Sequence, residues 1–186
     1  MSSILTRRYA SALLQVGKEH DLLDEFLEQY AEMINQIKKE KKFEQLLNSP
    51  RIIHSQKKKI INEVFANTMN SYFLNFIYVL IDKGRLTYLE EIFLDFKEMV
   101  YKEKDILPIK VVSAIPLKEE QLVRVKEKLT KILKKEILIQ NKVDPSIIGG
   151  LIVYAGDKIL DGSIKSKIAK LKVNLKEIRL QEIGVN

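Results

Sequence analysis

Among the residues of the chain, the glycines between 149 and 162 have the type and spacing most similar to a phosphate-binding loop. Backbone amides exposed by glycine, close to a helix that begins near Ser163, could hold a phosphate group. The stretch GGLIVYAGDKILDGS matches neither GxxxxGK[ST] nor GxGxxG, however, and none of its glycine loops runs from a strand straight into a helix with a following lysine and hydroxyl residue. We therefore interpret these glycines as parts of turns.

The other reactive side chains do not form a catalytic set. The chain has no cysteine, which excludes thiol nucleophiles, disulfides and cysteine-ligated metals, and its only histidines are His20 and His54. Each histidine lies at an expected helix boundary, where we expect it to face solvent or cap the helix. Ser163 is better placed to cap a helix than to act as a nucleophile. No carboxylate pair, Ser-His-Asp set or metal-ligand spacing stands out, so the sequence predicts a protein that is not an enzyme and uses no cofactor or metal.

Turns and short strands must position the glycine-rich stretch. Asp144-Pro145 holds the chain extended and then turns it, while Gly149-Gly150 permits close backbone approach or a positive φ. Leu151–Tyr154 is apolar and partly β-branched, as in a buried strand. Lys158–Leu160 would return beside it through a two-residue hairpin turn. The turn and cap residues of this motif are Gly156, Asp157, Asp161, Gly162 and Ser163.

Apolar residues after Ser163 recur at alternating spacings of four and three. They are Ile164, Ile168, Leu171, Leu175 and Ile178. This spacing places them along one side of a helix. Two interpretations remain open, because the pattern suits packing against the core of the same domain and also suits docking of a partner helix.

The first hundred residues read as consecutive amphipathic helices joined by short connections, which predicts a bundle of about six helices. The first expected helix begins after a cap at Ser2 or Ser3, and the fourth begins after a cap at Ser55. The second, third, fifth and sixth span residues 23–37, 40–48, 70–83 and 89–100. The fifth of them is apolar almost all round, which predicts a central helix or one that a partner covers.

Strands replace helices near Asp105. The β-rich run 107–114 is followed by an amphipathic helix to Leu133 and by a second strand, 136–143. With the two short strands and the helix of the glycine motif, the order is β-α-β-β-β-α. The predicted fold class is therefore α+β, with a helical domain at 1–104 and a small α/β domain at 105–186.

Positive charge is concentrated in the second half of the chain. The net charge is +7. Residues 1–104 hold 16 Lys and Arg against 15 Asp and Glu, whereas residues 105–186 hold 16 against 10. A basic half suits a nucleic-acid-binding scaffold. The basic residues are mostly isolated lysines with few interleaved aromatics, however, which favours a solvated face or an acidic protein partner.

Several separate motifs along nearly the whole chain resemble the delta subunit of F-type ATP synthases, the family of the oligomycin-sensitivity-conferring protein. The C-terminal match comprises VDPS at 143–146, Gly149-Gly150, Gly156-Asp157 and IxDGS at 159–163. Further matches are RYAxAL at 8–13, NSPR at 48–51, KII at 59–61, Asn75-Phe76 and LIDKGRL at 80–86. The chain departs from the family at Lys118, where a small capping residue is usual.

The resemblance implies a non-catalytic stator subunit that links the catalytic head to the peripheral stalk and so couples proton-driven rotation to ATP synthesis. It implies that domain 1–104 holds N-terminal segments of the alpha subunits and that domain 105–186 holds the C-terminal region of subunit b. The candidate contacts are Tyr9, Leu13, Phe73 and Ile77 for alpha, each of which could instead be core, and Ile164 and Ile168 for b.

The resemblance also implies a location. The longest nearly apolar run, 72–81, is interrupted by Asn75 and is too short to span a bilayer. We therefore expect a peripheral protein that meets the membrane only through its complex and binds no nucleic acid. The expected site is the cytoplasmic face of a bacterial membrane, with the stromal face of a plastid thylakoid as the alternative.

Overall fold

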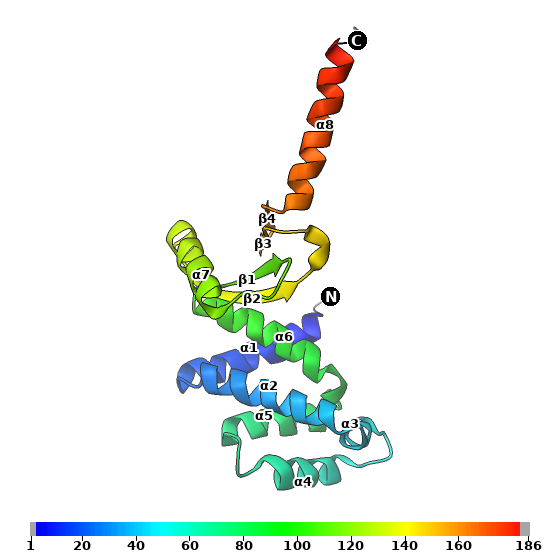
Figure 1. Ribbon diagram of the computed structural model, residues 1–186. Helices are drawn as coiled ribbons and strands as arrows, with labels where there is room; N and C mark the ends of the chain where they lie inside the picture. The colour runs from blue at the N-terminus through cyan, green and yellow to red at the C-terminus, as the bar shows by residue number, and fades with distance from the viewer. Residues whose placement is uncertain (1–2, 183–186) are drawn as a thin grey trace. The chain divides into compact units, whose positions relative to one another are not determined.

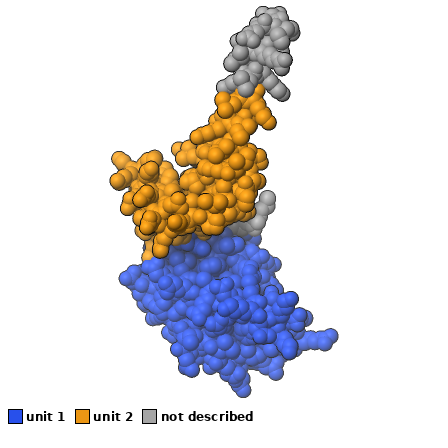
Figure 2. All heavy atoms as spheres, in the orientation of Figure 1, with its two compact units in different colours: residues 1–103 blue, residues 104–186 orange. Residues whose placement is uncertain are grey.

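The computed structural model describes residues 3–182, with side chains described as far as Val173. The chain divides into two compact units, residues 1–103 and 104–186, which Figure 2 shows in different colours. Each unit is considered by itself below. None of the described helices is long and apolar enough to cross a membrane.

Unit 1 consists of helices, as the amphipathic repeats predict (Figure 1). Its elements among the described residues are α1 (Ile4–Glu19), α2 (Leu23–Lys39), α3 (Lys41–Asn48), α4 (His54–Phe65), α5 (Ser71–Asp82), the short 3₁₀ helix η1 (Leu86–Tyr88) and α6 (Leu89–Glu103). The expected bundle of about six α-helices is confirmed.

Polar side chains fix the starts of two of these helices. Ser3 caps α1 by accepting a hydrogen bond from the Thr6 backbone N–H, and the Thr6 hydroxyl accepts one from the Ser3 N–H in return. Asn70 caps α5 in the same way through the Tyr72 N–H. The expected cap at Ser55 is wrong: α4 begins one residue earlier, at His54, and the residue before it, Ile53, makes no side-chain cap.

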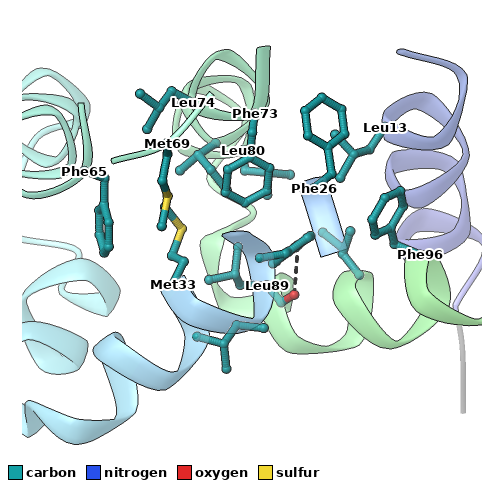
Figure 3. Close-up of a cluster of buried hydrophobic side chains, with 14 of the residues drawn as sticks. Leu13, Phe26, Met33, Phe65, Met69, Phe73, Leu74, Leu80, Leu89 and Phe96 are labelled. Atoms are coloured by element: carbon teal, nitrogen blue, oxygen red, sulfur yellow. Dashed lines mark hydrogen bonds between the residues drawn. The ribbon is translucent and has the colours of Figure 1, made fainter. Parts of the chain in front are cut away.

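Aromatic side chains form the centre of the unit 1 core. Tyr30 is fully buried, its hydroxyl donates a hydrogen bond to the Leu89 carbonyl oxygen at 3.0 Å, and burial raises the pKa of this phenol well above its ordinary value. Its ring centroid lies 5.2 Å from that of Phe73 and 5.0 Å from that of Phe93. Figure 3 shows Phe26, Phe73 and other core side chains of different helices reaching into this common interior. This core holds the helices in place around the surfaces described below.

Unit 2 contains a four-stranded sheet in the order β2-β1-β3-β4. Its elements are β1 (Ile106–Ser113), α7 (Glu119–Leu133), β2 (Glu136–Val143), the 3₁₀ helix η2 (Pro145–Ile147), β3 (Leu151–Ala155), β4 (Lys158–Asp161) and α8 (Ile164–Glu182). Strands β1 and β2 are parallel, so they need a crossover, and α7 supplies it. The other pairs are antiparallel. The predicted order β-α-β-β-β-α and the α+β class are confirmed.

Helix α7 lies beside the sheet (Figure 1). Its apolar side packs on the sheet. Leu129 of α7 lies in one buried cluster with Ile109, Val111 and Ile137 of the sheet. Lys118, where the family usually has a small capping residue, provides no side-chain cap. Instead, the Lys118 backbone N–H donates to Gln121 Oε1 at 2.9 Å, which satisfies one donor at the helix start.

Candidate functional site

An apolar hollow of about 470 Å³ lies between α1 and α5 of unit 1 and is wide enough to seat part of a helix. We call it the α1/α5 groove. It is lined by Arg8, Tyr9, Ala12, Leu13, Val16, Tyr72, Asn75, Phe76 and Val79. The α1 residues recur at helical spacing on one side of that helix, and the α5 residues do the same opposite them, so two apolar stripes face one hollow.

The groove exists because α5 is apolar on more than its inward side. Its inward residues Phe73, Leu74, Ile77, Leu80 and Ile81 are buried in the core. Tyr72 and Val79 point away from that core and are 45% and 46% exposed. Large apolar side chains left half exposed in a row mark a surface that a partner can cover.

Of the four groove candidates named from the sequence, two line the groove and two lie in the core. Tyr9 lines the groove and is partly buried, and Leu13 forms its floor with 1% exposure. Phe73 and Ile77 are 0% exposed and do not line the groove, so they are core residues that a docked segment cannot reach. The stripe of Tyr72, Phe76 and Val79, spaced by four and three, was missed, although that spacing is visible in the sequence.

Polar groups stand at the edges of the groove. Arg8 is the one charged side chain among the residues that line it, and Asn75 is the one amide. At the end of α1, the ring of His20 stacks on the ring of Tyr72. The groove can therefore bind an apolar helical stripe and contact a carboxylate beside it through Arg8.

In unit 2, the glycine-rich motif serves close packing. A Cβ on Gly149 would lie 2.6 Å from Ile164 Cδ1, and one on Gly150 would lie 2.3 Å from the Gly162 carbonyl oxygen. Gly150 also has φ of +78°, which other residues rarely adopt. The Ile164 N–H donates to the Gly149 carbonyl at 2.9 Å. The glycine pair thus lets the start of α8 lie directly against the backbone that precedes β3.

Hydrogen bonds hold the turns on both sides of this contact. Asp144, followed by Pro145 at the start of η2, accepts a hydrogen bond from the Ser146 N–H, and Asp161 accepts one from the Ser163 N–H, both at 2.9 Å. These bonds from the serines lower the pKa of both carboxyls. Ser163 Oγ accepts from the Ser166 N–H and caps α8. Its oxygen is thus engaged as a cap.

The hairpin of the motif has the expected form. Ala155 pairs with Lys158, which leaves Gly156 and Asp157 as a two-residue turn, with Gly156 at φ of +58°. Among the residues whose placement is described, no group of three or more His, Asp or Glu side chains is arranged to hold a metal ion. The hydrogen bond from the Ile164 N–H to the Gly149 carbonyl makes the motif the connection between the sheet and α8.

A second apolar surface lies on this connection, and we call it the β4–α8 surface. It consists of Ile164, Ile168 and Leu171 on one side of α8, which are 40–60% exposed. The neighbouring strand β4 adds the exposed residues Ile159 and Leu160, whose side chains point to opposite faces of the sheet. Ile168 and Leu171 are therefore not core residues of unit 2, whereas Ile164, although 42% exposed, packs its Cδ1 against Gly149. The side chains of Leu175 and Ile178 lie outside the described residues. Exposed lysines accompany the seam at 165, 167, 170 and 172.

A comparison against protein families finds a match over most of the chain. The sequence model of the family described as ATP synthase delta (OSCP) subunit matches residues 5–175. The chain belongs to the ATP synthase delta (OSCP) subunit family. Delta-family chains are stator components associated with the peripheral stalk.

Curated relatives support this assignment over nearly the full length. The chain is 35% identical over 181 residues to the ATP synthase subunit delta of Clostridioides difficile, covering 96% of this chain and 99% of the relative. It is 35% identical over 178 residues to that of Alkaliphilus oremlandii, covering 96% and 99%. Nothing in these matches supports the alternative of a nucleic-acid-binding scaffold.

Chains of solved structures share the fold of this chain. A chain of the Toxoplasma gondii mitochondrial ATP synthase hexamer superposes with a TM-score of 0.71 at 19% identity, covering 93% of this chain and 98% of that one. A chain of the Polytomella F-ATP synthase gives a TM-score of 0.50 at 24% identity, covering 56% and 92%. At these identities the likeness concerns the fold alone.

Proposed function

We propose that this delta-family chain joins the catalytic head of an F-type ATP synthase to its peripheral stalk, so that proton-driven rotation is coupled to ATP synthesis. Unit 1 holds the N-terminal segment of an alpha subunit in the α1/α5 groove. Unit 2 holds the C-terminal region of subunit b on the β4–α8 surface. The observation that carries the proposal is the outward stripe of Tyr72, Phe76 and Val79 facing the apolar side of α1.

The shape and chemistry of the groove suit an amphipathic helix. Such a helix presents apolar residues at spacings of three and four, which match the two stripes of the groove. Each Leu or Ile that it buries contributes about 1.5–3 kcal/mol before the entropy of binding is subtracted. A connector of this kind requires two binding surfaces and no reaction centre, so we infer a structural rather than an enzymatic role.

The groove is tested by calorimetric titration of the full chain with a synthetic peptide of the alpha N-terminal segment from the same organism. Val79→Asp should weaken binding by about 2 kcal/mol or more, because a carboxylate would be buried against apolar side chains. Val64→Asp is the matched control, since Val64 on α4 is 48% exposed, close to the 46% of Val79, and lies outside the groove. Absence of peptide heat with the wild-type chain, or equal effects of both variants, would exclude docking in the groove.

Subunit b is assigned to the β4–α8 surface because its apolar residues have no cover within unit 2 and lysines surround them. Burial of apolar residues should dominate affinity, because exposed ion pairs contribute only about 0–1 kcal/mol each. Ile168 is 40% exposed, so Ile168→Asp should leave the circular dichroism spectrum unchanged and abolish binding of a subunit b C-terminal peptide. Retained binding with an intact fold would remove Ile168 from the contact.

We also propose that the chain is a peripheral protein on the cytoplasmic face of a bacterial membrane, reached through its complex. The named relatives are bacterial, which favours this location over a thylakoid. Inside-out membrane vesicles should retain the chain when the complex is intact and release it when the head is stripped off. Binding of the purified chain to bare lipid vesicles would contradict this proposal.

A further inference from the structure

A second hollow in unit 1 lies between α2, α3, η1 and α6 and has a volume of about 340 Å³. We call it the acidic pocket. Its floor is apolar and buried, and consists of Ile34, Ile37, Leu47 and Leu89. Leu94, on α6, lines it with 64% of its surface exposed. It shares no lining residue with the α1/α5 groove, so an occupant of one leaves the other free.

The rim of the acidic pocket carries more negative than positive charge. Its lining includes the carboxylates of Glu44, Glu90 and Glu91 and a single ammonium group, that of Lys38. Lys38 Nζ forms an ion pair with Glu90 Oε2 at 2.7 Å. Within residues 3–173, no ion pair is found for Glu44 or Glu91. Two carboxylates therefore remain to face an occupant, in a chain whose net charge is +7.

We propose that the acidic pocket is a second docking surface, which takes a basic protein segment that carries an apolar anchor. The anchor covers Leu94 and enters the apolar floor, while lysine or arginine side chains beside it meet Glu44 and Glu91. Apolar burial supplies the affinity, and charge complementarity supplies the preference for a basic over an acidic segment. The proposal is independent of the alpha and b contacts described above.

The preference is tested with two synthetic amphipathic helices that share a leucine stripe, one with lysine and one with glutamate at the remaining positions. Fluorescence anisotropy measures their binding at moderate salt to the Val79→Asp chain, in which binding to the α1/α5 groove is blocked. The lysine peptide should bind at least about tenfold more tightly, a difference of about 1.4 kcal/mol. The double variant Glu44→Lys with Glu91→Lys should abolish that preference. The control pair, Glu28→Lys with Glu63→Lys, makes the same charge change at exposed sites outside the pocket and should retain it.

The apolar part of the proposal has a separate test. Leu94→Ser should weaken the lysine peptide about fivefold or more without changing the fold, because the side chain is exposed in the free chain. Equal binding of the two peptides, equal losses in the two double variants, or loss of binding in Val79→Asp would each overturn the proposal. Light scattering tests whether a second copy of the chain occupies the pocket instead. If the wild-type chain self-associates with rising concentration and the double variant Glu44→Lys with Glu91→Lys does not, the proposal is overturned.

Discussion

The imidazole of His20 and the phenol ring of Tyr72 are stacked, with ring centroids 4.2 Å apart and an interplanar angle of 22°. His20 follows the last residue of α1, and Tyr72 lies in the first turn of α5. The pair thus joins the end of α1 to the start of α5 and supports Tyr72, which lines the α1/α5 groove. His20, whose residue type is often catalytic, thus packs against a residue that lines the groove.

The first prediction concerns this stacked pair. His20→Ala should weaken binding of the alpha peptide by about 0.5–1.5 kcal/mol, because Tyr72 loses the ring that holds it at the edge of the groove. Calorimetric titration of the full chain provides the measurement. The control is His54→Ala, which removes the other histidine, an exposed residue at the start of α4. Equal affinities for the two variants would show that the stack does not support the groove, while leaving the groove itself in place.

The second prediction concerns Tyr30. Tyr30→Phe removes the donor to the Leu89 carbonyl and should lower the free energy of unfolding by about 0.5–1.5 kcal/mol at neutral pH. Because burial raises the folded-state pKa, the unfolded phenol ionises first, above its ordinary pKa of about 10. Wild-type stability should therefore fall as pH rises beyond that value, by up to about 1.4 kcal/mol per pH unit from this group.

Urea unfolding between neutral pH and pH about 11 measures both effects of Tyr30, in the range where tyrosine ionises. Tyr30→Phe should flatten the alkaline fall, and Tyr88→Phe, at a side chain that is 38% exposed, should not. An unchanged alkaline slope in Tyr30→Phe would mean that other groups cause the whole loss of stability at high pH.

The third prediction compares two glycines of the motif. Both have positive φ, but a Cβ on Gly156 would meet nothing within 4 Å, whereas one on Gly150 would lie 2.3 Å from the Gly162 carbonyl oxygen. Gly156→Ala should cost about 1–2 kcal/mol from the backbone conformation alone. Gly150→Ala should cost about 1–3 kcal/mol more, because the start of α8 must move. Urea unfolding of unit 2 measures both losses. Equal losses of unfolding free energy in Gly156→Ala and Gly150→Ala would contradict the close contact at Gly150.

The fourth prediction concerns the junction of the two units. Limited trypsin digestion should cut between residues 100 and 108, where α6 ends at Glu103 and Asp105 has φ of +53°, and should leave a folded helical fragment. Mass spectrometry identifies the cut, and circular dichroism tests the fragment. A single cooperative melting transition with no cleavage at the junction would argue against independent domains.

The fold was largely predictable from the sequence, because local patterns determine it. Helical spacing, caps and the hairpin turn are encoded within a few residues, and the order of elements followed from them. The start of α4 was less determined, because Ser55 is a good cap by type but the chain enters the helix at His54. Such boundaries depend on neighbouring contacts as well as on propensity.

The surfaces were predictable only in part, because they depend on how elements pack. Helix α5 is apolar on nearly every side, so its sequence cannot show which side the core takes, and Phe73 was placed in the groove when Phe76 lines it. For the α8 seam, the sequence shows which side of the helix is apolar but not whether that side is buried. Its spacing is the same whether the side chains are buried or free, and only the structure shows Ile168 and Leu171 exposed.

The contact between the glycine pair and the start of α8 has a mechanical consequence. Helix α8 has 19 residues, so it extends for about 28 Å from this contact. Movement of its far end becomes rotation at its first turn, where backbone hydrogen bonds and the fit of Ile164 over Gly149 resist it. The close contacts that oppose such rotation exist because Gly149, Gly150 and Gly162 have no side chain.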